Sequence, residues 1–222
     1  MTRKTNAKQI IVDEFIARVE AGSLKAVHVS KLIKELGINR NTFYYHFTSK
    51  YDVAMFVFRT DLAHELERVF PQEELVYSPI DAKAGAQELA FYTHREIAAR
   101  TLDSGEFYKT LVRCLLKRQA FYRGLFDQQE PEFLTLVDAL YRPAAQDDLE
   151  FMLGGRYLPD PTFELLVTLI ASQVPSVARY YLLHTRDAEL LLDDKVNPFW
   201  NITHETLLHE LQNHPINRPR NV

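Results

Sequence analysis

The sequence predicts an all-α fold in which a small three-helix unit is followed by a larger helical bundle. Apolar residues recur at steps of three and four along most of the 222 residues, which brings them to one face of an α-helix. Glycine, proline and capping residues interrupt this pattern at intervals of one helix length. No stretch of alternating apolar and polar residues between turn signals indicates a strand convincingly. We therefore expect helices throughout.

The first helix is indicated by Ile11, Phe15 and Val19, which follow one another at four-residue spacing. Gly22 comes next as a stop signal. This pattern predicts a first helix of about 15 residues.

Two short helices follow with a tight turn between them. Apolar positions in residues 29–36 mark the second helix, and Gly37 then supplies a residue that tolerates a positive φ. Asn39 can cap a third helix that runs through Phe47, with Phe43 and Phe47 on its inner face. The three helices are expected to share one small core.

A long fourth helix begins at a capping-box signal, Ser49 with Asp52 three residues later. The apolar pattern continues to about Phe70, and Pro71 ends it.

Residues 71–79 are polar and rich in turn formers, which is typical of a connector. We expect one domain over residues 1–70, with the start helix of the second unit from about residue 50, and a helical regulatory and dimerisation domain over residues 71–222. The connector is short enough that the two parts should touch.

Later helix boundaries are marked by proline and glycine. Asp160 and Asn197 each precede a proline, the pattern of a capping residue with proline in the first helical position. The glycine pair at 154–155 ends the preceding helix. Pro175 falls within a periodic stretch and is expected to kink the helix without ending it.

The helix that starts near residue 161 is apolar on two sides, so it needs two packing partners. One partner would lie in its own subunit and the other across a two-fold axis, although both stripes could also be buried within a monomer. The second stripe contains Leu166, Leu169, Gln173, Ser176, Tyr180 and Leu183. We predict that this helix and the final helix of the chain form a homodimer interface. Its predicted residues are Val167, Ile170, Val174, Val177, Tyr181, Trp200, Leu207 and Leu211.

Charge is distributed unevenly along the chain, whose formal net charge is −4. Residues 1–60 contain 10 of the 26 Lys and Arg residues but only 5 of the 30 Asp and Glu residues, which leaves 16 against 25 for the remainder. The amino-terminal part therefore suits a polyanionic partner and the rest does not.

The sequence indicates a cytoplasmic protein without a membrane partner. Its longest apolar run, residues 53–58, is far shorter than the roughly 20 residues that span a bilayer. No apolar signal-peptide region follows the first lysines. Cys114 is the only cysteine, which excludes an internal disulfide and a multi-cysteine zinc site.

The outer face of the predicted third helix is rich in hydrogen-bonding groups and carries no acid. Arg40 and Asn41 lie at its amino-terminal end, where Arg can bind guanine and Asn can bind adenine in the major groove. Hydroxyl, imidazole and ammonium groups along the helix suit phosphate oxygens. The residues we predict to contact DNA are Asn39, Arg40, Asn41, Thr42, Tyr44, Tyr45, His46 and Lys50.

Residues 24–53, LKAVHVSKLIKELGINRNTFYYHFTSKYDV, resemble the DNA-binding segment of the TetR/AcrR family of transcriptional regulators. The block TFYYHF with the following Lys50 is its most specific part. The resemblance implies that Thr42, Tyr44, His46 and Lys50 approach DNA. It also implies a homodimer on a pseudo-palindromic operator and a helical second domain that binds a small-molecule effector. His28 departs from the family, which usually has Thr or Ser there, so we expect a weaker cap or a solvent-facing residue.

Aromatic residues between positions 91 and 126 could line a ligand pocket, although such a stripe is more often plain core. The weak ligand-binding candidates are His94, Arg113, Tyr108 and Tyr122.

An enzyme is not expected. His204 and His209 flank a segment like a zinc-protease motif, but their five-residue spacing turns them off a common helix face. We expect no catalytic residue, cofactor or metal. Two function classes remain: an effector-responsive DNA-binding regulator, most simply a repressor, and a helical protein-interaction module that retains a helix-turn-helix core without specific operator binding.

Overall fold

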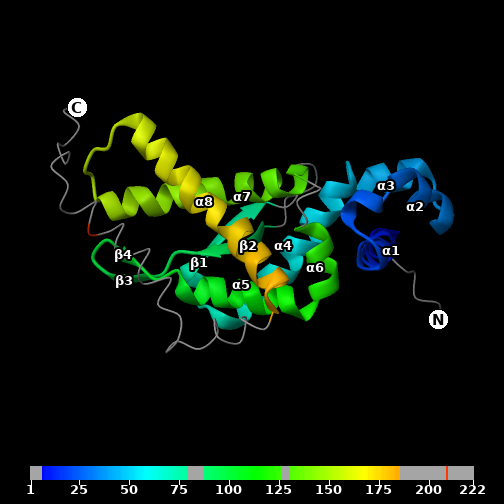
Figure 1. Ribbon diagram of the computed structural model, residues 1–222, viewed down its shortest axis with the longest axis horizontal. Coiled ribbons are helices and arrows are strands. Elements are labelled where there is room, and N and C mark those ends of the chain that lie inside the picture. The colour runs from blue at the N-terminus through cyan, green and yellow to red at the C-terminus, as the bar shows by residue number, and fades with distance from the viewer. Residues whose placement is uncertain (1–6, 80–87, 127–130, 186–208, 210–222) are drawn as a thin grey trace.

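The computed structural model describes residues 7–79, 88–126, 131–185 and 209, and helices account for most of them. Figure 1 shows an elongated molecule with α1, α2 and α3 at one end and the helices of the carboxy-terminal half at the other. The amino-terminal helices are α1 (Ala7–Ala21), α2 (Val29–Leu36), α3 (Arg40–His46) and α4 (Lys50–Val69). They are followed by α5 (Gly105–Lys117), α6 (Gln119–Leu125), α7 (Pro131–Leu153) and α8 (Asp160–Leu183).

The first four helices lie within a few residues of where the apolar spacing predicts them. Ile11, Phe15 and Val19 are buried on one side of α1. The backbone amide of Asp52 donates to Ser49 Oγ at the start of α4, and the Asp52 carboxylate accepts from the Thr48 amide. The predicted capping interaction between Ser49 and Asp52 is therefore present. The backbone amide that donates to the Asp52 carboxylate belongs to Thr48 and not to Ser49.

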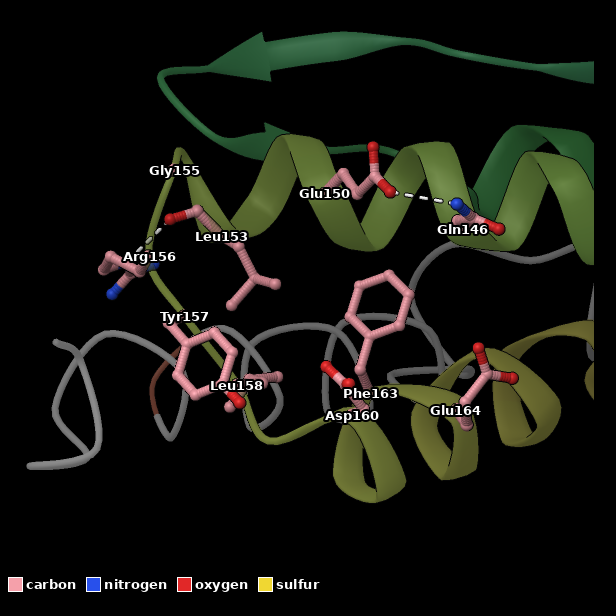
Figure 2. A pocket seen from close by; sticks show the side chains of 10 residues that line it. All are labelled: Gln146, Glu150, Leu153, Gly155, Arg156, Tyr157, Leu158, Asp160, Phe163 and Glu164. Atoms are coloured by element: carbon pink, nitrogen blue, oxygen red, sulfur yellow. Dashed lines mark hydrogen bonds between the residues drawn. The ribbon is translucent and has the colours of Figure 1, made fainter. Parts of the chain in front are cut away.

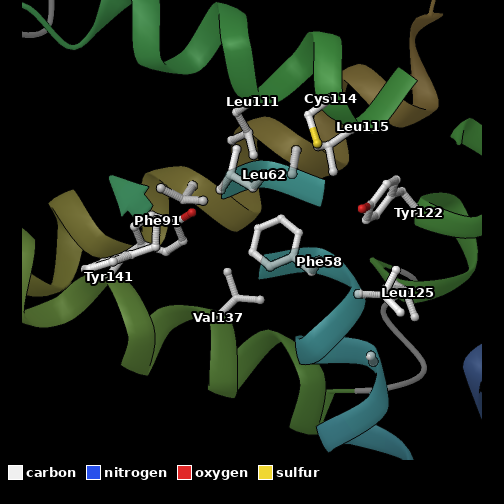
Figure 3. Packing of buried hydrophobic residues seen from close by; sticks show 14 of the residues in the cluster. Phe58, Leu62, Phe91, Leu111, Cys114, Leu115, Tyr122, Leu125, Val137 and Tyr141 are labelled. Atoms are coloured by element: carbon white, nitrogen blue, oxygen red, sulfur yellow. The ribbon is translucent and has the colours of Figure 1, made fainter. Parts of the chain in front are cut away.

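Helix α4 runs from the amino-terminal end into the middle of the larger part. Phe58 and Leu62 of α4 are fully buried there, surrounded by side chains of β2, α5, α6 and α7 (Figure 3). The short helix α6 packs against α1, and its Tyr122 contacts Phe58 and Asp61 of α4. Phe121 of α6 meets Phe15 of α1 edge to face, with ring centroids 6.2 Å apart. The two parts of the chain therefore share an apolar interface.

The prediction that every element is a helix is wrong in one region. Strands β1 (Leu75–Pro79) and β2 (Glu88–Thr93) form an antiparallel pair, and β3 (Glu96–Ala98) pairs with β4 (Thr101–Leu102). The predicted connector at 71–79 contains a 3₁₀ turn (Gln72–Glu74) and the whole of β1. The described part of the chain is thus mostly helical with two small antiparallel sheets.

Burial explains why strand β2 gives no strand signal. Its last five residues are all buried, so they do not alternate between apolar and polar. The buried guanidinium of Arg59 on α4 donates to the carbonyls of Ser78 and Pro79 on β1 at 2.6 and 2.8 Å. The hairpin is therefore held by long-range contacts with α4.

Other boundaries agree with the sequence to within one residue. Gly154 and Gly155 have φ of 55° and 81° and end α7, as predicted. Helix α8 begins at Asp160, so that residue lies in the first turn and Pro159 takes the capping position. The helix continues through Pro175. Asn197 lies outside the described residues.

Helix α8 is the one helix of the described residues that is long and apolar enough to cross a membrane, judged by length and composition. It packs against α7, α5 and α6 on one side. A single helix of this kind is weak evidence for a membrane segment, because core helices have the same composition.

Candidate nucleic-acid interface

The turn between α2 and α3 is built by two residues with defined conformational roles. Gly37 has φ of 63°, where a side chain would be strained, and its amide donates to the carbonyl of Lys34. Asn39 then caps α3, because its Oδ1 accepts from the backbone amide of Asn41 at 2.9 Å. These interactions fix the angle at which α3 leaves the turn.

The inner face of α3 anchors it in the amino-terminal core. Phe43 and Phe47 are 0% and 2% exposed, and their ring centroids lie 6.1 Å apart. Phe47 also meets Phe56 of α4 edge to face. Two phenylalanines therefore hold this seven-residue helix, which is too short to be stable on its own.

The outer face of α3 is open to solvent. Tyr45 is 83% exposed and Tyr44 is 45% exposed, both unusual values for large aromatic side chains. Asn41 is exposed beside Tyr45. No Asp or Glu occurs between Asn39 and Lys50. The predicted DNA-contact surface is thus uncovered by the described part of the chain.

The two flanks of α3 differ in chemistry. On one flank the Arg40 guanidinium lies over the Tyr44 ring, 5.3 Å from its centroid, which is a cation–π contact. On the other flank, Thr42 and His46 lie one helical turn apart and are both half-buried. Burial first, and the Lys8 charge second, lower the pKa of His46.

Lys50 has a structural contact that its sequence position does not reveal. Its Nζ donates to the backbone carbonyl of Leu24 at 2.9 Å, and Leu24 itself is fully buried. The ammonium also lies 5.1 Å from the centroid of the Tyr51 ring. Lys50 therefore links the start of α4 to the loop between α1 and α2, in addition to its predicted place near DNA.

His28 occupies the capping position of α2 but makes no capping bond through its side chain, which is exposed. Its backbone carbonyl accepts from the amides of Lys31 and Leu32. The departure from the family residue thus leaves α2 without a side-chain cap.

The predicted ligand-binding candidates do not form one polar pocket. Tyr108 and Tyr122 are buried, and their hydroxyls donate to Gln173 and Asp61 respectively. Burial raises the pKa of both tyrosines. His94 pairs with Asp148, whereas Arg113 pairs with Glu106 on its own helix.

An open cavity of about 670 Å³ lies between the end of α7 and the start of α8 (Figure 2). None of the four ligand candidates lines it. Its polar groups are largely satisfied: Glu150 accepts from Gln146, and Arg156 donates to the carbonyl of Leu153. Its walls are formed by Gln146, Glu150, Leu153, Gly155, Arg156, Tyr157, Leu158, Asp160, Phe163 and Glu164.

Three residues of the predicted dimer seam on α8 are buried within the chain itself. Val167, Val174 and Val177 are buried within their own chain at 2%, 1% and 8% exposure, so they are not available to a partner. Ile170 and Tyr181 are half-buried. Trp200, Leu207 and Leu211 lie outside the described residues. Both stripes of α8 are apolar, and their spacing in the sequence does not say which one packs inward.

The exposed stripe of α8 lies opposite these valines. Leu165, Leu169 and Leu183 are 58%, 53% and 52% exposed, and Tyr180 is 48% exposed. At 100° per residue these four positions fall within about 60° of one another. The hydroxyl of Ser176, on the same stripe, donates to a carbonyl of its own helix. The stripe therefore presents two apolar patches, Leu165 with Leu169 and Tyr180 with Leu183, with the polar Ser176 between them.

Comparison with known proteins gives one family match. Residues 20–54 match the model for "Bacterial regulatory proteins, tetR family". Among solved structures, the chain is similar to "Dihydroxyacetone kinase operon activator DhaS", with a TM-score of 0.47 and 12% sequence identity over 90% of this chain and 97% of that one. No curated protein gives a significant match. The family match spans α2, the turn and α3, the elements that present the exposed surface. Residues 20–54 are therefore similar to the DNA-binding helix-turn-helix of TetR-family transcriptional regulators.

Proposed function

We propose that this protein is a homodimeric, sequence-specific transcriptional regulator, most simply a repressor whose operator affinity is lowered by a small-molecule effector. The observation that carries the proposal is the outer face of α3, which is exposed, free of acids and presented by a family-type helix-turn-helix. A surface of this kind can enter the major groove of duplex DNA.

Within this proposal, the amino-terminal end of α3 determines sequence specificity. Asn39, Arg40 and Asn41 are exposed there, and Arg and Asn form the bidentate pairs that distinguish guanine and adenine. Thr42, Tyr44, Tyr45 and His46 supply groups for phosphate and sugar oxygens along the groove. Lys50 adds a phosphate contact at the start of α4. Its hydrogen bond to the Leu24 carbonyl keeps the ammonium in position for this contact.

The dimer would form through the outward stripe of α8. Leu165, Leu169, Tyr180 and Leu183 are exposed apolar residues on one side of α8, and a partner subunit could cover them. A two-fold axis across this stripe would present two copies of α3 to successive major grooves, and hence to a pseudo-palindromic site.

Control by an effector would act through the joint between the two parts of the chain. We place the division near residue 70, with α4 common to both parts. Because α6 packs against α1 and contacts α4 through Tyr122, a ligand that prefers one arrangement of the larger part would shift the spacing of the two α3 helices. The cavity between α7 and α8 is one place where such a ligand could bind.

The proposal is tested by selecting duplexes that bind the full chain from a random pool, and then measuring the affinity of two variants for the selected site. Arg40→Ala and Tyr44→Ala should each weaken binding by about 1–3 kcal/mol without loss of fold. Arg123→Ala, an exposed arginine on α6, is the matched control and should bind like the wild type. If no duplex is enriched, the helical protein-interaction module becomes the better interpretation.

A further inference from the structure

The first turn of α1 places Lys8 beside α3. The Lys8 ammonium lies 3.8 Å from the centroid of the Phe56 ring on α4 and 5.6 Å from that of Phe47. A cation at these distances is held by the negative faces of the rings. The Lys8 side chain therefore has a defined position next to the carboxy-terminal end of α3.

Lys8 and His46 both lie near the Phe47 ring, whose centroid is 5.6 Å from the Lys8 ammonium and 6.4 Å from the centroid of the His46 ring. The Lys8 charge contributes, after burial, to lowering the pKa of the His46 imidazole. The other ring neighbours of His46 are Tyr45 at 4.9 Å and Phe47 at 6.4 Å, neither of which carries a charge. The pair thus combines the positive charge of Lys8 with an imidazole, which offers an N–H donor in either protonation state.

The position of Lys8 in α1 is not one that the helix dipole favours. Lys8 is the second residue of α1, whose first turn contains no acid. The helix dipole disfavours a positive charge at the amino-terminal end of a helix. An anion bound beside Lys8 would reverse the sign of that interaction.

We infer that Lys8 and His46 together bind one backbone phosphate of the DNA, on the Thr42–His46 flank of α3. The inference rests on the proposed function, because the phosphate belongs to the duplex whose groove receives α3. A phosphodiester has one charge shared over two free oxygens, which the Lys8 ammonium and the His46 N–H complement. The contact carries no base information and instead fixes how α3 lies in the groove.

The test uses the full chain, the duplex selected from the random pool, and the variants Lys8→Met, Lys8→Arg and Lys109→Met. Methionine keeps an apolar chain against the Phe56 ring while it removes the charge. Lys109→Met removes the same charge from α5 and controls for net charge. Affinity is measured over a series of salt concentrations, and thermal unfolding is followed in parallel.

Lys8→Met should bind about threefold to tenfold more weakly, with the slope of log K against log salt concentration smaller by about 0.9, the value for one phosphate contact. Lys8→Arg and Lys109→Met should keep the wild-type slope. Duplexes in which single phosphates are replaced by neutral methylphosphonates should reveal one position that weakens wild-type binding but not that of Lys8→Met. Neutralising the same phosphate should weaken DNA binding by His46→Gln less than it weakens binding by the wild type.

An unchanged salt slope in Lys8→Met would overturn the inference, whether its affinity is kept or falls together with its melting temperature. Failure of the wild-type chain to select any duplex would instead overturn the proposed function. The two failures are therefore distinguishable.

Discussion

Tyr92 on β2 donates a hydrogen bond from its hydroxyl to Asp148 on α7, with 2.8 Å between the two oxygens. Nδ1 of His94, the first residue after the strand, lies 2.9 Å from the other oxygen of the same carboxylate. Asp148 and Tyr92 are both buried, so the hydrogen bond between them forms where water competes little, whereas the contact with His94 is only part-buried. This carboxylate ties the end of β2 to α7 and thereby holds the hairpin against the larger part of the chain.

Tyr92→Phe should lower the free energy of unfolding by about 1.5–3 kcal/mol, because it removes a hydrogen bond to a buried charged group. Urea unfolding followed by circular dichroism measures the change. Tyr77→Phe removes a hydroxyl from an exposed position on β1 and should change stability by less than about 0.5 kcal/mol. Equal losses in the two variants would contradict a specific role for the Tyr92–Asp148 bond.

The His94–Asp148 pair predicts a pH dependence of stability. The hydrogen bond to Asp148 raises the pKa of His94, while partial burial opposes this effect. The pair therefore contributes fully below the unfolded pKa of about 6.5, and its contribution is lost as the pH rises through the higher folded pKa. Because the His94 side chain is 36% exposed, we expect a contribution below about 1 kcal/mol.

Unfolding experiments at pH 6 and pH 9 with wild type and His94→Gln measure this term. The wild type should lose more stability than the variant between the two pH values. A larger loss in His94→Gln would reverse the predicted sign.

The contact between α6 and α1 predicts a sharp effect of one methyl group. A Cβ at Gly124 would lie 2.7 Å from Val19 Cγ1 and 3.1 Å from the Val19 carbonyl oxygen. The valine side chain is stiff and the carbonyl belongs to a helix, so neither can move away cheaply. Gly124→Ala should therefore destabilise the protein by about 1–3 kcal/mol, although alanine is the better helix former.

Gly22→Ala is the matched control for this prediction, since its Cβ would meet nothing closer than 3.5 Å. Thermal unfolding of both variants tests the contact. A stable Gly124→Ala would show that α1 and α6 can separate without cost, and that α6 does not couple the two parts of the chain.

The amino-terminal helices could be predicted from the sequence because their signals are local. Gly37, Asn39 and Ser49 each act within a few residues of their position, and the structure shows the positive φ and the capping bonds expected of them. The inner and outer faces of α3 follow from a period of 3.6 residues, with Phe43 buried and Tyr45 exposed.

What the sequence could not reveal depends on contacts between distant residues. Strand β2 is buried along its length because α4 covers it, so its pattern does not differ from that of a core helix. The bond from Lys50 to Leu24 spans 26 residues. Asp148 was not among the predicted site residues, since nothing in its neighbourhood indicates that Tyr92 and His94 meet it.

The exposed stripe of α8 predicts how two subunits assemble. A carboxylate in the middle of an apolar dimer interface would be desolvated without a partner, and two copies would face each other across a two-fold axis. Leu169→Glu should therefore shift the protein from dimer to monomer in sedimentation equilibrium. Leu169 is 53% exposed, so the fold of the subunit should be retained and circular dichroism should not change. Gln72→Glu adds the same charge at an exposed polar position and should leave the dimer intact. The monomer should also lose operator affinity, because two linked α3 helices bind with a higher effective concentration than one. A Leu169→Glu protein that remains dimeric would show that the outward stripe of α8 is not the interface.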